Sequence, residues 1–453
     1  MKNSLIRPLL FLFIVTVGVI CLRYIPQLNL FGYEVKSVDF LSDLVTTHTL
    51  EAETEEINFT IEEYKEIEPN CPEGVTCIED YSQGNKFGMS SFYESLLQRE
   101  SLNRPIRIAY FGDSFVEGDI LTADLRELLQ KEFGGVGVGY LSITPESPGF
   151  RKSVTQNFNG WEGHQVTDKN NFNAKEQSIA QTYAYPNGKA FVQVKASDRY
   201  SCSSQFKTSS FYLKSDYPVS VNVTINGNEQ ATLTSKGTGE IEALTIEGNF
   251  TQLRWDIETS DTLLAKPLCH GIAIESIEGI VLDNFAMRST SGMHLLSIDN
   301  NYLKQLNKIR PYDLIILHYG LNVANKNTTK YDSYVNQMSQ LISKLKECFP
   351  ETSILITSVG DREDKIDGEL HTMPSVLSMI KYQQKMAIEN KVAFWNLYQA
   401  MGGERSIVKM AEKSPAEART DYTHITREGG KTLAEIYFKA LMAGYENYKQ
   451  TEE

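Results

Sequence analysis

Two parts of the chain alternate short apolar runs with amphipathic helical segments, and this alternation restricts the fold more than any other feature. Ile106–Phe111 predicts a buried strand, and Leu121–Phe133 predicts a helix that stops at Gly134-Gly135. Alternation resumes after residue 275. There, strands are expected at 279–286, 314–317, 353–357 and 392–395, and helices at 331–348, 377–390 and 427–445. This pattern predicts an α/β domain whose parallel sheet is covered by helices on both faces.

Residues 150–275 follow a different pattern, because short runs of alternating polar and apolar residues recur there without helices between them. Asn226-Gly227 between two such runs is a strong hairpin signal. We therefore expect an all-β sandwich, 150–275, inserted into a domain made of 82–149 and 276–448. Four aromatic residues of the insert are either sandwich core or a surface that binds carbohydrate: Trp161, Tyr183, Tyr185 and Trp255.

The N-terminus carries an apolar run, Leu9–Leu22, between Arg7 and Arg23. The run is shorter than the ~20 residues that span a bilayer easily, but apolar neighbours on both sides extend it. We expect residues 1–26 to form a signal anchor or transmembrane segment. The alternatives are a cleaved signal peptide, although no alanine precedes Ala52, and a buried core helix. An anchor or a signal peptide places the body outside the cytoplasm, facing the periplasm or the cell exterior.

Residues 27–81 crowd glutamates into a stretch with little periodicity, which predicts an acidic, solvated spacer. The whole chain of 453 residues has a net charge of −14. This charge argues against nucleic acid as a partner, because nucleic-acid binding needs a basic face.

The cysteines leave the disulfide pattern open. Cys71 and Cys77 bracket a short Pro/Gly loop and are either a disulfide or two free thiols. Cys202 and Cys269 both lie in the β-rich stretch and are a second candidate pair. Cys348 would then be a leftover buried thiol.

Two segments far apart in the sequence carry the residues of nucleophilic catalysis. Ser114 follows a buried strand directly and precedes a helix, so it lies at the carboxyl end of a parallel sheet, where such folds bind ligands. Asp421 and His424 lie just before the last helix. Histidine is the usual base for a serine, and a carboxylate fixes its tautomer. Each segment also has a non-catalytic interpretation, in which Ser114 or Asp421 only caps the start of a helix.

Two further segments follow strands where an oxyanion would need donors. Asn322 comes after the strand at 314–317, and its amide can donate to a developing negative charge. Gly292 follows the strand ending near Ala286, and a glycine permits close approach of its N–H. His318 and His371 lie near these loops, but their spacing suggests no metal site.

Together these segments resemble the four sequence blocks of SGNH (GDSL-like) hydrolases. Gly-Asp-Ser114 matches the nucleophile block, Ser-Thr-Ser-Gly292 the glycine block, Gly-Leu-Asn322 the asparagine block and Asp421-Tyr-Thr-His424 the DxxH block. The resemblance implies a flavodoxin-like sheet, a Ser114–His424–Asp421 triad and an oxyanion hole from the Ser114 and Gly292 amides and the Asn322 side chain. It implies neither a metal nor another cofactor.

The extended first block, Asp119–Arg126 with Phe133–Tyr140, looks more specifically like envelope enzymes that act on O-acetyl groups of cell-wall polysaccharide and carry a β-sandwich insert. Phe115 stands where that subgroup often has histidine, and Ile425 where many relatives have proline. The resemblance implies a serine esterase that removes O-acyl groups from a carbohydrate. The alternatives are an O-acetyltransferase that uses the same triad with a membrane-bound acyl donor as partner, and a non-catalytic glycan-binding protein.

Overall fold

The computed structural model describes residues 28–30, 33–35, 71–168, 170–259, 266–366 and 368–452. Two short strands near the N-terminus, β1 (Leu28–Leu30) and β2 (Tyr33–Val35), pair antiparallel with each other in a unit separate from the body of the chain. The predicted anchor, 1–26, lies outside the described residues. Among the residues that are described, none of the helices combines the length and apolar content that a membrane crossing requires.

The body contains a six-stranded sheet in the order β14-β4-β15-β16-β19-β3. The first five of these strands are parallel, and only β3 at the edge is antiparallel. Numbered by their place in the chain, the parallel strands follow the flavodoxin-like order 2-1-3-4-5, whose switch point lies between β4 and β15. Their bounds are β3 (Glu79–Asp80), β4 (Ile106–Gly112), β14 (Ile280–Asn284), β15 (Leu314–His318), β16 (Ser353–Thr357) and β19 (Ala393–Trp395).

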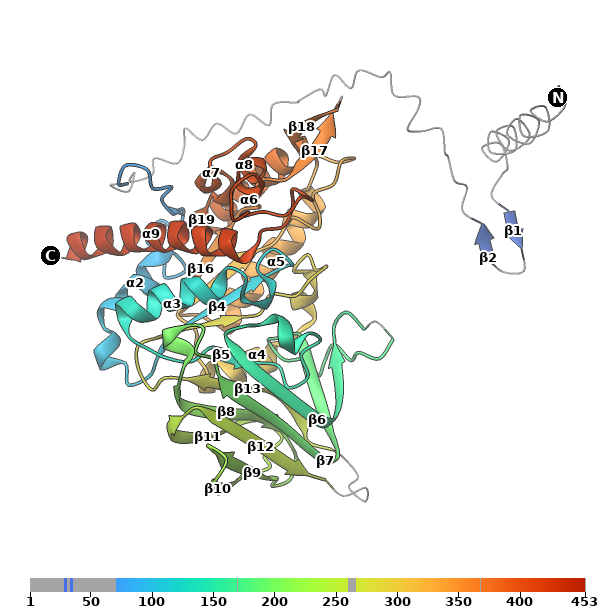
Figure 1. Ribbon diagram of the computed structural model, residues 1–453, viewed down its shortest axis with the longest axis vertical. Helices are drawn as coiled ribbons and strands as arrows, with labels where there is room; N and C mark the ends of the chain where they lie inside the picture. The colour runs from blue at the N-terminus through green and yellow to red at the C-terminus, as the bar shows by residue number, and fades with distance from the viewer. Residues whose placement is uncertain are drawn as a thin grey trace, which may run out of the picture. The chain divides into compact units, whose positions relative to one another are not determined.

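Helices pack against this sheet in two groups, one of α2, α3 and α9 and the other of α4, α5 and α6 (Figure 1). Tyr437 fixes α9 to the sheet, because its ring stacks on Trp395 with 4.0 Å between centroids and its hydroxyl lies 2.8 Å from Thr357 Oγ1. The bounds are α2 (Met89–Leu97), α3 (Thr122–Phe133), α4 (Asn300–Ile309), α5 (Asp332–Cys348), α6 (Pro374–Asn390), α7 (Leu397–Met401), α8 (Ser406–Ala411) and α9 (Arg427–Glu452).

The β-rich stretch forms a sandwich-like antiparallel sheet of nine strands with a hydrophobic core of its own (Figure 1). The predicted hairpin at Asn226-Gly227 joins β9 and β10, and both residues adopt the positive φ that such a turn requires. The strands are β5 (Gly139–Leu141), β6 (Val154–Gln165), β7 (Thr182–Ala196), β8 (Phe206–Lys214), β9 (Ser220–Ile225), β10 (Glu229–Thr234), β11 (Ile241–Phe250), β12 (Gln252–Glu258) and β13 (Leu268–Glu275).

The four aromatic residues of the insert divide between core and surface. Trp255 is fully buried and its Nε1 donates to Ser209 Oγ (3.1 Å), and Tyr183 is buried as well. Trp161 and Tyr185 are half-buried. For Trp255 and Tyr183, the sandwich-core interpretation is therefore the right one.

Three sequence expectations need correction. The antiparallel sheet begins before residue 150, because β5 pairs with β13. The spacer ends before residue 81, because β3 joins the parallel sheet and Ile78 and Tyr81 are buried in its core. Cys202 and Cys269 are both unpaired. By contrast, Cys71 and Cys77 do form a disulfide, and Cys348 is a buried free thiol.

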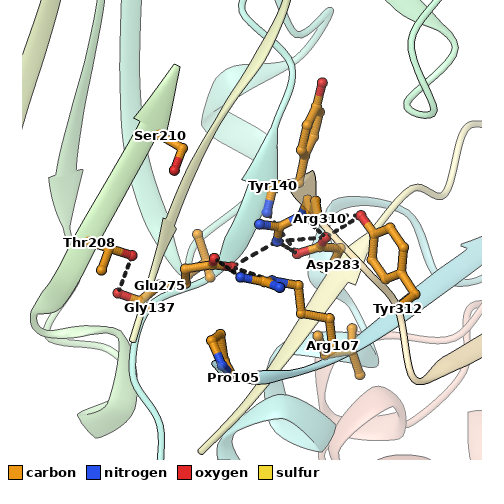
Figure 2. Close-up of polar contacts among 12 residues, drawn as sticks. Pro105, Arg107, Gly137, Tyr140, Thr208, Ser210, Glu275, Asp283, Arg310 and Tyr312 are labelled. Atoms are coloured by element: carbon orange, nitrogen blue, oxygen red, sulfur yellow. Dashed lines mark hydrogen bonds and ion pairs between the residues drawn. The ribbon is translucent and has the colours of Figure 1, made fainter. Parts of the chain in front are cut away.

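A cluster of buried charges joins the two sheets, and we call Arg107, Glu275, Asp283, Arg310 and Tyr312 the interface cluster (Figure 2). Arg107 comes from β4, Asp283 from β14 and Glu275 from β13 of the antiparallel sheet. Arg310 lies 2.8 Å from both carboxylates, Arg107 lies 2.7 Å from Glu275, and the Tyr312 hydroxyl donates to Asp283 (2.7 Å). Burial alone would raise the pKa of Glu275, but the two arginines lower it to about 2. The pairing keeps these charges satisfied where the sheets meet.

Candidate active site

Ser114, His424 and Asp421 form a continuous line of hydrogen bonds at the carboxyl end of the parallel sheet. Ser114 Oγ lies 3.0 Å from His424 Nε2, and His424 Nδ1 lies 2.9 Å from Asp421 Oδ2. Ser114 is half-buried, whereas the His424 and Asp421 side chains are 34% and 47% exposed. The serine hydroxyl is therefore within reach both of a base and of solvent.

The turn that presents Ser114 is built by its neighbours. β4 runs beside β15 until Gly112 pairs with His318. The Asp113 carboxylate then accepts a hydrogen bond from the Phe115 amide (3.0 Å), which closes the turn after the strand. Gly112 has to be small, because a Cβ there would lie 2.4 Å from Val116 Cγ2.

Asp113 is nearly completely buried next to Ser114. Burial raises its pKa to about 6, although the hydrogen bond from the Phe115 amide and the nearby His424 act to lower it. The Asp113 carboxyl group therefore holds its proton more strongly than an ordinary aspartate does.

Hydrogen bonds within the loop that carries Asp421 and His424 hold its shape. Asp421 Oδ1 accepts hydrogen bonds from the amides of Thr423 and His424, each 3.0 Å long, while Oδ2 faces the ring of His424. Burial opposes ionisation of Asp421, but these hydrogen bonds outweigh it and hold its pKa below the usual value. Ile425, in place of proline, is buried and pairs with Ala418 in a short bridge that fixes the end of the loop.

The two predicted oxyanion segments contact each other. Asn322 Nδ2 donates to the main-chain oxygen of Thr290 (3.0 Å), which ties Asn322 to the loop that carries Gly292. Gly292 adopts φ +86°, and a Cβ there would lie 2.8 Å from the Tyr319 ring. The position therefore requires glycine. One amide hydrogen of Asn322 is used on Thr290, which leaves the second for another acceptor.

The other histidines near these loops have different environments. His318 is buried, its Nδ1 lies 3.0 Å from the Tyr110 hydroxyl, and burial lowers its pKa to about 3. Phe115, where the subgroup often has histidine, packs edge-on against His318 with 5.4 Å between ring centroids. His371 is 44% exposed on β18 (Glu369–Thr372).

The sequence did not reveal Arg427 as part of this region. Arg427 opens α9 just after His424, and its Nη2 donates to the main-chain oxygen of Phe150 (2.5 Å). Its guanidinium also lies 5.5 Å from the centroid of the Phe150 ring. Because Phe150 lies far away in the sequence, no local pattern indicated this contact.

A solved structure shares the fold. The chain aligns with a peptidoglycan O-acetylesterase at 21% identity and a TM-score of 0.66, over 82% of this chain and 99% of that chain. Alignments also exist with a family two carbohydrate esterase from Cellvibrio japonicus (7% identity, 65% of this chain, 99% of that chain, TM-score 0.25) and a salicylyl-acyltransferase from a tetracycline biosynthetic pathway (13% identity, 66% of this chain, 95% of that chain, TM-score 0.27). These two scores are too low to carry an argument. No protein-family model and no curated protein matches the sequence. The fold that the resemblance predicts is confirmed.

Proposed function

We propose that this chain is an SGNH-type serine esterase that removes O-acyl groups, chiefly O-acetyl, from a cell-envelope or extracellular carbohydrate. The observation that carries the proposal is the hydrogen-bonded line from Ser114 through His424 to Asp421. The solved protein of the same fold acts, by its name, on O-acetyl groups of peptidoglycan, which supports a glycan ester as the substrate class.

The first half-reaction forms an acyl-serine. His424 Nε2 takes the hydroxyl proton of Ser114 while Oγ attacks the acyl carbonyl carbon. Asp421 accepts the Nδ1–H, so the lone pair of the ring lies on Nε2 and the imidazolium is stabilised. The C–O bond to the sugar then breaks, and His424 gives its proton to the departing sugar oxygen.

The second half-reaction restores the serine. His424 removes a proton from water, the hydroxide oxygen attacks the acyl carbon, and the carboxylic acid leaves as Ser114 recovers its proton. In both halves the carbonyl oxygen becomes negatively charged. We assign its donors as the Ser114 and Gly292 amides and the Asn322 side chain.

The remaining segments fit this function. The anchor at 1–26 would hold the body at the membrane, with the acidic residues that follow as a spacer. The inserted antiparallel sheet would contact the glycan. The substrate of such an enzyme is an acylated carbohydrate, and nucleic acid is no partner of a chain this acidic.

The test is Ser114→Ala in the full-length protein, with an aryl acetate and an O-acetylated oligosaccharide as substrates. Acetate release and labelling by a fluorophosphonate should both disappear, while the melting temperature stays close to that of the wild type. Ser101→Ala is the matched control, because Ser101 is exposed at the other end of β4. Near-normal acetate release by Ser114→Ala would refute the assignment.

Free acetate and acetylated glycan should be followed together, with an unacetylated oligosaccharide present. An esterase releases acetate to water, whereas an acetyltransferase passes the same acyl group from Ser114 to a sugar hydroxyl. Transfer exceeding hydrolysis would favour the acetyltransferase, and binding of glycan without any release of acetate would favour the non-catalytic alternative.

A further inference from the structure

A cavity of about 150 Å³ lies where the antiparallel sheet meets the loops at the carboxyl end of the parallel sheet. One side is lined by Glu117 and Gly118 of the 3₁₀ turn η3 (Glu117–Asp119). The other side is lined by Gln156 and Gln165 of β6 and Thr182 of β7. Both sheets therefore contribute walls to the same space.

The wall from the parallel sheet is continuous with the segment that presents the nucleophile. η3 begins just after Ser114. Met287 lines the cavity in the loop after β14, and its amide donates to the Gly112 oxygen (3.0 Å), just before Ser114. The cavity wall is thus linked to the turn that carries Ser114, although Ser114 itself does not line the cavity.

The third wall is joined to the base. Phe150 lines the cavity, and its ring covers Gly118, where a Cβ would lie 2.1 Å from the ring. Arg427, which follows His424 at the start of α9, donates to the Phe150 oxygen. The cavity is therefore bounded by segments that lead to both partners of the Ser114–His424 pair.

The walls suit a neutral polar molecule. Phe150 and Gln165 line the cavity together with Gln156, whose Nε2 donates to the main-chain oxygens of Ser142 and Ile143, and aromatic rings with a few polar groups are typical of small-molecule sites. Glu117 is neutralised by Arg288 at 2.8 Å, and Glu146 at the rim disfavours an anionic guest. At about 30 Å³ per water molecule, the space corresponds to roughly five waters, so part of one sugar unit can enter it.

Buried charges hold both walls in place. Arg151 donates to Asp119 (2.8 Å) and to the main-chain oxygens of Val138 and Tyr140 (3.0 and 3.4 Å). Asp119 also pairs with Arg126 at 3.1 Å. The interface cluster joins the two sheets nearby (Figure 2). A cavity between fixed walls binds its ligand without the free-energy cost of closing around it.

We propose that this cavity is a subsite for one neutral sugar unit of the acylated glycan, so that the insert and the parallel sheet hold the substrate jointly. The inference rests on the proposed function, because the sugar unit in the cavity would belong to the glycan whose ester Ser114 attacks. It also goes further, because it assigns the insert a direct part in choosing the substrate.

The test fills the cavity with Gln165→Trp in the full-length protein. Its matched control is Gln193→Trp. Gln193 is a half-buried glutamine near the C-terminal end of β7. The readout is kcat/KM for an O-acetylated hexamer of N-acetylglucosamine divided by kcat/KM for an aryl acetate. We expect Gln165→Trp to lower this ratio at least 10-fold and Gln193→Trp to leave it unchanged. Equal ratios in the two variants would overturn the subsite.

A second pair of variants covers the case in which Gln165→Trp fails to fold. Phe150→Ala removes the ring from the wall, and Phe191→Ala removes a half-buried ring of β7 that likewise faces an arginine, Arg254 at 3.6 Å. Only Phe150→Ala should lower the ratio, and a ratio unaltered by Phe150→Ala would count against the subsite.

A binding experiment separates this inference from the proposed function. Ser114→Ala is titrated calorimetrically with unacetylated hexamers of N-acetylglucosamine, xylose and glucose, with and without Gln165→Trp. If one of these hexamers binds and Gln165→Trp weakens that binding at least 10-fold, the subsite is supported. The subsite is supported even if the wild type releases no acetate, because that result would refute only the proposed esterase activity. Binding of none, or equal binding with and without Gln165→Trp, overturns the subsite.

Discussion

Asp421→Asn is the sharpest test of how the candidate triad works, because it changes one hydrogen bond of three. Asp421 accepts from the Thr423 and His424 amides through Oδ1 and faces the His424 ring through Oδ2. An asparagine keeps Oδ1 for the two amides, so the loop keeps its shape. The new NH₂ group, however, cannot accept the Nδ1–H, and the ring is driven to the tautomer that carries hydrogen on Nε2. Nε2 then cannot take the Ser114 proton.

The expected loss of kcat/KM depends on how exposed the Asp421 and His424 side chains are. In a serine protease triad, the same change lowers kcat by about 10⁴. Here the Asp421 and His424 side chains are 47% and 34% exposed, so water can partly replace the lost acceptor. We therefore expect kcat/KM for an aryl acetate to fall about 10³-fold, or about 4 kcal/mol at 1.36 kcal/mol per tenfold. The melting temperature should change by no more than a few degrees.

The control is Asp299→Asn. Asp299 caps α4 by accepting the Tyr302 amide (2.8 Å), and asparagine caps a helix about as well as aspartate. Steady-state kinetics and thermal unfolding of both variants decide the question. If Asp421→Asn kept wild-type kcat/KM, Asp421 would only shape the loop. If its rate and its stability fell together, the loss would reflect folding and not the tautomer.

Two further predictions concern the oxyanion donors and the carboxyl group beside the nucleophile. Asn322→Ala should lower kcat by about 10²–10³ with little change in KM, as removal of one oxyanion donor does, and an unchanged kcat would mean that the free amide hydrogen points elsewhere. Asp113→Asn should make stability less dependent on pH. The folded pKa of Asp113 is raised to about 6 from an ordinary 3.8, so its protonated form favours folding below about pH 4 and that contribution is lost as the pH rises through 6. In urea unfolding, the variant and the wild type should have equal free energies of unfolding at pH 4. At pH 8 the variant should be more stable by up to about 3 kcal/mol, and a difference in free energy of unfolding that does not change with pH would contradict this.

The sequence predicts the parallel sheet well because its strands are buried on both faces. Ser353–Thr357 is the strand β16 with the bounds expected from its apolar run, and the helix at 331–348 differs from α5 by one residue. A strand with no exposed face needs a continuous apolar run, and such a run is visible without any tertiary information. The alternating helix and strand segments then fix the fold class.

The elements that the sequence misses depend on distant partners. β5 (Gly139–Leu141) is too short to show a period, and only pairing with β13 makes it part of the antiparallel sheet. β3 likewise joins the parallel sheet only because it pairs with β19. The sequence could propose Ser114, His424 and Asp421 as a triad because each lies in a short motif at an element boundary. The cavity and the Phe150–Arg427 contact were not, because they join residues from both sheets.

The contact between Phe150 and Arg427 links the cavity to the loop that carries His424. Asp421 and His424 lie on a partly exposed loop, and their position depends on the bridge at Ile425 and on the start of α9. Arg427 ties that start to Phe150, which leads into β6 and covers Gly118. A sugar packed against Phe150 would therefore contact the ring that covers Gly118 and lies 5.5 Å from the Arg427 guanidinium. Under the subsite proposal, Phe150 would therefore have two roles, because it lines the cavity and also holds the start of α9 after His424.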